Sequence, residues 1–86
     1  MTRRVPPAAR VTRALDDLGP GESCVIVSID GDSHTARRLM ELGLVPGTTV
    51  EVVRRAPMGD PVELRVRRTH LSIRRSEAGR VHVESH

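Results

Sequence analysis

Residues 36–66, ARRLMELGLVPGTTVEVVRRAPMGDPVELRV, decide the fold of this chain. In their first part, apolar residues recur at intervals of three and four, which places them on one face of a helix. Gly43 follows, and glycine commonly ends helices because it adopts a positive φ without strain. Upstream, Asp32 or Ser33 can accept hydrogen bonds from the free amides of a first helical turn. We therefore predict a helix from one of these two residues to about Leu42.

Alternating apolar and polar residues, the pattern of strands, fill most of the remaining chain. Within the deciding stretch the pattern covers residues 48–56 and 61–68, and Pro46 with Gly47 fits a type II turn before the first of them. The two prolines of the intervening loop exclude that loop from a central strand. The same pattern predicts further strands at residues 22–30, 71–74 and 81–84, with a turn at residues 76–79.

Five short strands and one helix suit a small closed or half-closed barrel, because closure removes exposed strand edges. We predict a mostly β fold, a five-stranded SH3-like barrel with the helix between the first two strands. Leu39, Met40 and Leu44 are expected to close one end of this barrel. The barrel is expected to comprise residues 12–86, whereas residues 1–11, rich in Arg, Pro and Ala, form a loosely ordered tail.

The composition argues against catalysis. The 86 residues include no Phe, Tyr or Trp, so 12 Val, 7 Leu and 3 Ile must supply most of the core. A core of such small side chains does not enclose the deep pocket that enzymes usually need. All 14 basic residues are arginine, and the absence of lysine excludes a nucleotide-binding P-loop. We therefore expect a binding protein and not an enzyme.

The net charge of +3 is unevenly distributed along the chain. Four of the 14 arginines lie in residues 1–13, which leaves 10 arginines against 11 acidic residues in residues 14–86. The predicted barrel is thus close to neutral, and it lacks the aromatic side chains on which single-stranded nucleic acids stack. One group of arginines nevertheless keeps an alternative open, an SH3-like nucleic-acid-binding or ribosome-associated module. This group comprises Arg65, Arg67, Arg68, Arg74 and Arg75.

Metal-ligating residues are few, and no two have the spacing of a metal site. Cys24 alternates with Val25 in a predicted strand, which is typical of a small buried hydrophobe. A single cysteine forms no internal disulfide, and no apolar run has the length of a signal sequence or a membrane span, so we expect a cytoplasmic protein. We predict no cofactor and no metal site, and leave transition-metal binding open. The residues considered are Cys24, His34, His70, His82 and His86.

Three strings occur in a specific order and spacing: LDDLGPGESCVIVSIDG at residues 15–31, the deciding stretch at 36–66, and LSIRRSEAGRVHV at 71–83. Together they resemble the FeoA family, the small cytosolic component of bacterial ferrous iron uptake. One difference is Arg68, where the family usually has glycine just before the fourth strand. The residues that carry the resemblance are Leu39, Gly43, Pro46, Gly47, Pro57, Gly59, Asp60, Pro61, Arg74, Glu77 and Ala78.

This resemblance implies an SH3-like barrel without catalytic activity of its own. It also implies a partnership with FeoB, the membrane iron transporter that carries a cytosolic GTP-binding domain. On this basis we expect a protein that binds FeoB and supports or regulates ferrous iron transport. Such a protein reaches the inner face of the cell membrane only through its partner.

Most of the matching residues are expected to set backbone angles at turns. We predict in addition an ion pair between Asp60 and Arg74 that fixes the loop at residues 57–61. The outer face of the helix and this loop are predicted to form the surface that meets the partner, because flexible methionines suit adaptable contacts. The residues of this predicted partner surface are Arg37, Met40, Glu41, Leu44 and Met58.

Overall fold

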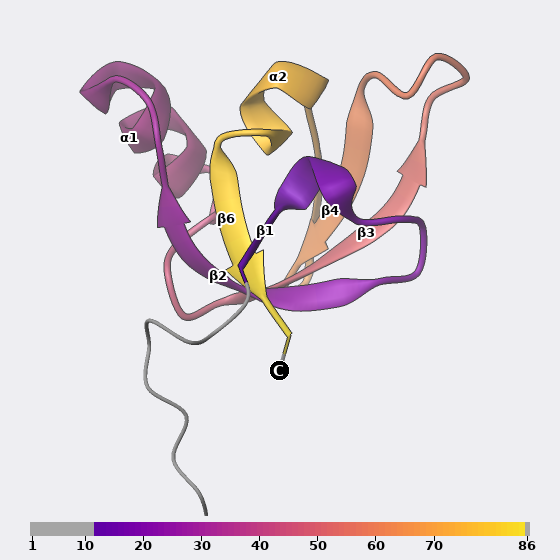
Figure 1. Ribbon diagram of the computed structural model, residues 1–86, viewed down its shortest axis with the longest axis horizontal. Coiled ribbons are helices and arrows are strands. Elements are labelled where there is room, and N and C mark those ends of the chain that lie inside the picture. Colours follow the sequence, from indigo (N-terminus) through magenta and orange to yellow (C-terminus); the bar gives the residue numbers. More distant parts are fainter. Residues whose placement is uncertain (1–11, 86) are drawn as a thin grey trace, which may run out of the picture.

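The computed structural model describes residues 12–85, so the predicted tail and His86 lie outside the described residues. Figure 1 shows a strongly curved sheet with the longer helix at one end. The strands are β1 (Arg13–Ala14), β2 (Ser23–Ile29), β3 (Thr49–Arg55), β4 (Val62–Val66), β5 (Thr69–Ile73) and β6 (Val81–Glu84). The helices are α1 (Ser33–Glu41) and α2 (Arg75–Ala78), and a 3-10 turn, η2 (Leu15–Asp17), follows β1.

The strands form one antiparallel sheet in the order β1-β6-β2-β3-β4-β5. The mostly β class is confirmed, and so are the five predicted strands and the helix between the first two of them. A sixth strand, β1, was not predicted, because two residues are too short to show alternation. The predicted turn at residues 76–79 was also wrong in kind, since α2 occupies most of it.

Two β-bulges bend this sheet. The register between β2 and β6 shifts between Ile26 and Ser28, and the register between β3 and β4 shifts between Val52 and Arg54. An extra residue in one strand of a pair increases the local twist. The sheet therefore curls into a barrel that remains open, because its edge strands β1 and β5 are not hydrogen-bonded to each other in the described chain.

Aliphatic side chains fill the interior of the barrel, as the composition requires. Cys24 is buried among them, as predicted. Leu39 and Leu44 are fully buried and close one end of the barrel, but Met40 is 41% exposed and takes no part in this closure. One residue along a helix turns the side chain by about 100°, so Met40 points away from the core that Leu39 enters. The other fully buried large side chains are Leu15, Leu18, Ile26, Val50, Val52, Val62, Leu64, Val81 and Val83.

Both ends of α1 follow the sequence signals. Asp32 is the N-cap residue, and its carboxylate accepts hydrogen bonds from the Thr35 amide at 2.8 Å and the Thr35 hydroxyl at 3.1 Å. These hydrogen bonds hold the pKa of Asp32 below its usual value. At the other end Gly43 has a φ of 110°, and the Leu44 amide donates to the Leu39 carbonyl oxygen at 3.1 Å. The left-handed glycine thus turns the chain so that Leu44 packs back into the core.

Side-chain contacts join η2, which follows the edge strand β1, to β3 and to α2, which follows the edge strand β5. The Asp16 carboxylate in η2 lies 2.9 Å from Nη1 of Arg55 and 3.2 Å from Nε of Arg75. Arg55 also donates to the main-chain carbonyl oxygens of Asp16, Leu18 and Gly59. The side chains of Asp16 and Arg55 are each 20% exposed, so this network is partly shielded from water. It joins η2 to the end of β3 and to the first residue of α2.

The predicted contact of Asp60 takes a different form. Its Oδ1 atom accepts a hydrogen bond from the backbone amide of Arg75 at 3.0 Å, instead of pairing with the Arg74 guanidinium. Amides in the first turn of a helix have no intrahelical partner and are therefore open to a carboxylate. The contact still fixes the loop at residues 57–61, but it does so at the start of α2.

Replacing Asp16 by asparagine tests its contacts with Arg55 and Arg75. Burial raises the pKa of Asp16, but hydrogen bonds and charges of Arg55 and Arg75 outweigh it and leave this pKa below its usual value. The carboxylate therefore stabilises the fold above the unfolded-state pKa of about 3.9, and this stabilisation is lost as the pH falls through the lower folded-state pKa. We expect Asp16→Asn to lower the free energy of unfolding at pH 7 by about 1 to 2 kcal/mol, measured by urea unfolding.

The same variant should lose less stability on acidification than the original protein, because the group that titrates is gone. Asp17→Asn is the matched control, since Asp17 is the exposed neighbour in η2. Equal losses in the two variants would show that Asp16 contributes only as a surface charge.

A second test concerns the turn between β4 and β5. Arg67 has a φ of 57°, which makes it the only residue other than glycine with a positive φ in the described chain. This conformation costs an L-residue about 1 kcal/mol. Glycine also adds conformational freedom to the unfolded chain, which offsets part of this gain, so we expect Arg67→Gly to raise the free energy of unfolding by less than about 1 kcal/mol and Arg68→Gly, with no positive φ to relieve, to lower it. A larger gain at Arg68, the position where the related family usually has glycine, would contradict the observed turn.

Candidate partner-binding surface

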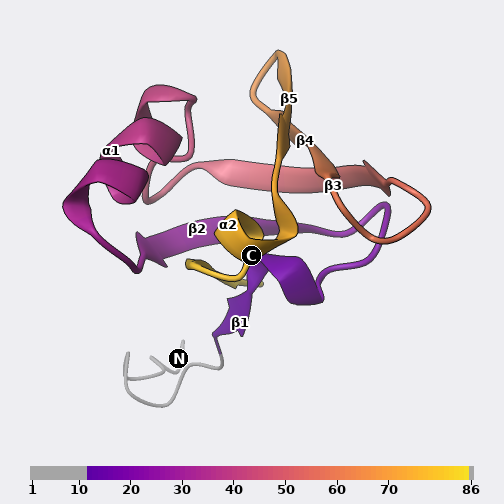
Figure 2. The same ribbon diagram turned by 90° about the horizontal axis from the view of Figure 1, so that it is seen from above.

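The outer face of α1 carries three residues of the predicted partner surface. Arg37, Met40 and Glu41, together with Ala36, line a shallow hollow of about 450 Å³. Residues three and four apart share a helix face, which is why these four lie together while Leu39 enters the core. Figures 1 and 2 both show α1 at one end of the molecule, beside the sheet. This group, Ala36, Arg37, Met40 and Glu41, is called the outer face of α1 below.

Exposed apolar area continues into the segment that leaves the helix. Leu42 and Val45 are 40% and 41% exposed, values close to the 41% of Met40. A protein of this size has few large apolar side chains, and those left in water are informative when several occur in one region. This end of the molecule therefore offers apolar contact area that the fold itself does not use.

Leu44 does not belong to any surface. Its exposure is 0%, so its expected role in partner contact was wrong. Gly43 reverses the chain direction, and the residue after such a glycine usually packs against the last turn of its helix. Leu44 consequently belongs to the core cluster that also contains Leu39.

Met58 is 88% exposed, but it does not share a face with α1. The chain enters β3 from α1 and reaches Met58 after β3, a strand of seven residues. Seven residues of strand span roughly 20 Å. Figures 1 and 2 both show the loop after β3 at the opposite end of the molecule from α1. The predicted partner surface is therefore divided between two distant places.

The arginines of the alternative interpretation are also dispersed. Arg65 lies 3.6 Å from Glu51 and donates to His70, while Arg75 contacts Asp16. Arg67 and Arg68 form the turn between β4 and β5, and Arg74 lines a separate pocket. The five residues do not form one basic face of the kind that tracks a phosphate backbone.

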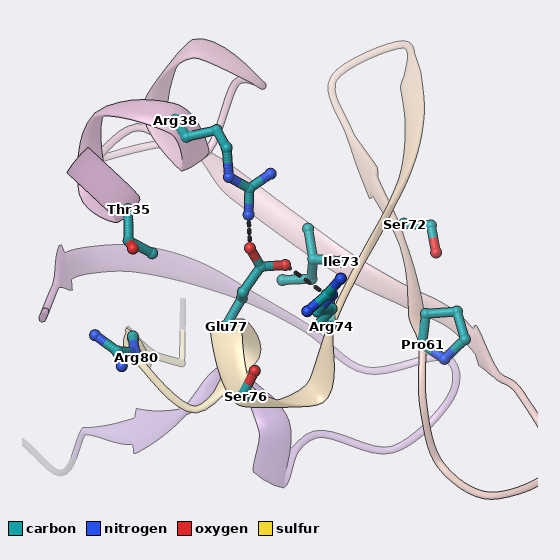
Figure 3. A pocket seen from close by; sticks show the side chains of 9 residues that line it. All are labelled: Thr35, Arg38, Pro61, Ser72, Ile73, Arg74, Ser76, Glu77 and Arg80. Atoms are coloured by element: carbon teal, nitrogen blue, oxygen red, sulfur yellow. Dashed lines mark hydrogen bonds and ion pairs between the residues drawn. The ribbon is translucent and has the colours of Figure 1, made fainter. Parts of the chain in front are cut away.

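A polar pocket of about 530 Å³ lies where α1, α2 and β5 meet (Figure 3). Arg38 of α1 and Glu77 of α2 point toward each other across it and form an ion pair. Sequence reasoning did not find this pocket, although Thr35 and Arg38 are three residues apart and so share the helix face beside the core. Its remaining lining residues are Pro61, Ser72, Ile73, Arg74, Ser76 and Arg80.

Within residues 12–85 no three His, Cys, Asp or Glu side chains lie close enough together to hold a metal ion. His82 of β6 contacts the Asp30 carboxylate at the end of β2. In the same part of the chain, neither helix has the length and apolar character needed to cross a membrane.

An open antiparallel barrel with one helix inserted after its first long strand defines a small SH3-like domain. Residues 13–85 match the family model described as the FeoA domain. The chain belongs to the FeoA family, as its sequence resemblance indicated.

Known proteins of the family support this assignment. The Fe(2+) transport protein A/Fe(2+) transporter FeoB fusion protein of Porphyromonas gingivalis is 39% identical over 70 residues, 81% of this chain but 8% of the fusion protein. The solution structure of FeoA from Chlorobium tepidum is 37% identical, with a TM-score of 0.80, over 85% of this chain and 70% of that one. FeoA of Stenotrophomonas maltophilia, an SH3 domain protein solved with zinc, is 38% identical, with a TM-score of 0.71, over 81% and 87%. These structures confirm the SH3-like fold.

The corrected position of Leu44 has a measurable consequence. Truncation of a fully buried leucine leaves a cavity in the core, so Leu44→Ala should lower the free energy of unfolding by about 2 to 5 kcal/mol. Leu42→Ala is the control, because Leu42 is 40% exposed and should lose less than about 1 kcal/mol. Thermal unfolding monitored by circular dichroism measures both. Similar small losses in the two variants would contradict the buried position of Leu44.

Proposed function

We propose that this protein is a non-enzymatic component of ferrous iron uptake that binds a FeoB-type transporter and supports or regulates it. The observation that carries the proposal is the fusion protein of Porphyromonas gingivalis, in which a segment similar to this chain is joined to a protein named as transporter FeoB. Two domains in one polypeptide meet at high effective concentration, an arrangement that favours domains that act together. By this likeness the partner of the present chain is a FeoB-type transporter, met from the cytoplasmic side.

We place the contact on the outer face of α1. Met40 supplies a flexible apolar centre, and Arg37 and Glu41 flank it with opposite charges. An apolar centre with a polar rim is the usual composition of a protein interface, and methionine adapts to the shape that it meets. In this part of the helix only Leu39 is buried in the core, so the side chains of the outer face do not contribute to core packing.

The proposed action is binding and not bond making. A contact centred on Met40 buries apolar area and should depend weakly on ionic strength. Binding to nucleic acid, the alternative function, depends on phosphate contacts and falls steeply with salt. The dispersal of Arg65, Arg74 and Arg75 favours the apolar protein contact over nucleic-acid binding. The salt dependence of binding distinguishes these two functions.

The proposal is tested by calorimetric titration of the protein against the cytosolic domain of its own FeoB, with and without guanine nucleotide, at two salt concentrations. We expect saturable binding that changes little with salt. Met40→Glu places a charge at the centre of the contact and should weaken binding at least about tenfold.

Met58→Glu is the matched control, because it makes the same substitution at an exposed methionine on the opposite end of the molecule. Binding should survive in this variant. Loss of binding in Met58→Glu with retention in Met40→Glu would move the contact to the loop after β3. Steep loss of binding at the higher salt concentration would contradict an apolar contact, and absence of binding in both nucleotide states would contradict a partnership with this domain.

A further inference from the structure

The polar pocket between α1, α2 and β5 has an unbalanced set of charges. Three arginines line it, Arg38 from α1, Arg74 from the start of α2 and Arg80 from the turn before β6. Among the described residues that line it, Glu77 is the only acidic one. The pocket therefore carries a surplus of two positive charges, although residues 14–86 as a whole are close to neutral.

Glu77 is already occupied by structural contacts. One carboxylate oxygen, Oε1, accepts the backbone amide of Arg74 at 2.8 Å, and the other, Oε2, pairs with Arg38. Its side chain is only 15% exposed. Both oxygens thus serve the N-terminal cap of α2 and the attachment of α1, and neither is left to neutralise Arg74 or Arg80.

Arg74 and Arg80 are exposed, and neither forms an ion pair with another residue in the described part of the chain. Arg80 lies beside the segment that joins β2 to α1. Its guanidinium lies against Gly31, where an added Cβ would meet Nη1 at 2.3 Å, and its carbonyl oxygen accepts the Asp30 amide at 2.7 Å. The structure therefore holds a guanidinium beside the pocket without giving it a carboxylate partner.

We propose that this pocket binds a phosphate group. A phosphate monoester carries a charge of about −1.5 to −2 at pH 7, which matches the surplus charge of the pocket. Guanidinium groups donate pairs of parallel hydrogen bonds to phosphate oxygens, and the hydroxyls of Ser72 and Ser76 line the same pocket. A carboxylate offers one charge and two oxygens, and is the poorer match. This activity goes beyond the proposed FeoB contact and does not depend on it.

A bound phosphate would compete with Glu77 for Arg38. The Arg38 side chain is 47% exposed, so it is free to exchange one oxyanion for another. Glu77→Gln removes the competing charge, while a glutamine at this position still accepts the amide that caps α2. The proposal thus predicts opposite effects for two substitutions in one pocket: Glu77→Gln tightens phosphate binding and Arg74→Gln weakens it.

The test is a titration of the full chain with sodium phosphate in chloride buffer at constant ionic strength, followed by the NMR shifts of the backbone amides. We expect saturable shifts centred on residues 72–77, several-fold tighter binding in Glu77→Gln, and about tenfold weaker binding in Arg74→Gln. Arg80→Gln provides a second weakening variant if Arg74→Gln unfolds. Arg37→Gln is the matched control, because it removes the same charge from the outer face of α1 and should leave affinity within about twofold.

Two further titrations test whether the ligand is free or esterified phosphate, and whether any anion binds equally well. Glycerol 3-phosphate replaces inorganic phosphate, and tighter binding of this ester identifies an esterified phosphate as the ligand, whereas equal or weaker binding identifies the free ion. Acetate replaces both as the carboxylate control and should shift the same amides only weakly. The proposal is overturned if phosphate gives no saturation, if acetate binds equally well, or if Arg37→Gln weakens binding as much as Arg74→Gln.

Discussion

The guanidinium of Arg55 holds together parts of the barrel that the sheet leaves separate. The sheet is open between β1 and β5, and a core without aromatic side chains has few groups long enough to reach across the seam. Arg55, the last residue of β3, joins this strand to the segment that follows β1 by donating to the Asp16 carboxylate and to carbonyl oxygens of Asp16, Leu18 and Gly59. A partly buried guanidinium is tolerated only when its donors are satisfied, and here several segments satisfy them at once. Through Asp16 the network also reaches Arg75, the first residue of α2, next to one wall of the polar pocket.

A helix of nine residues serves three purposes because its faces are chemically separate. Leu39 faces the core, Thr35 and Arg38 face the pocket, and the outer face meets solvent. Among the described side chains of the helix only Leu39 is fully buried, so the small aliphatic barrel leaves most of the helix surface exposed. The ion pair of Arg38 with Glu77 joins this helix to α2.

Local patterns sufficed for most of the fold. Alternation predicted β2 to β6, and Gly43 with Asp32 predicted both ends of α1, because these signals act within a few residues. The sequence did not reveal β1, which is two residues long, or the Asp16–Arg55 contact, whose partners lie 39 positions apart. The grouping of Met58 with the outer face of α1 was wrong for the same reason. Whether Met58 lies near Met40 depends on the direction in which β3 carries the chain, and no local pattern contains that information.

Most of the residues that link this chain to its family determine the backbone conformation of turns. Gly43, with a φ of 110°, and Gly47, with a φ of 92°, set backbone angles. None of the individual residues named as carrying the resemblance lies on the outer face of α1. The pocket differs in this respect, because Arg74 and Glu77 both belong to the matching set and both line it. The charge of the pocket therefore depends on a residue that also stabilises the fold, because the Glu77 carboxylate both caps α2 and pairs with Arg38.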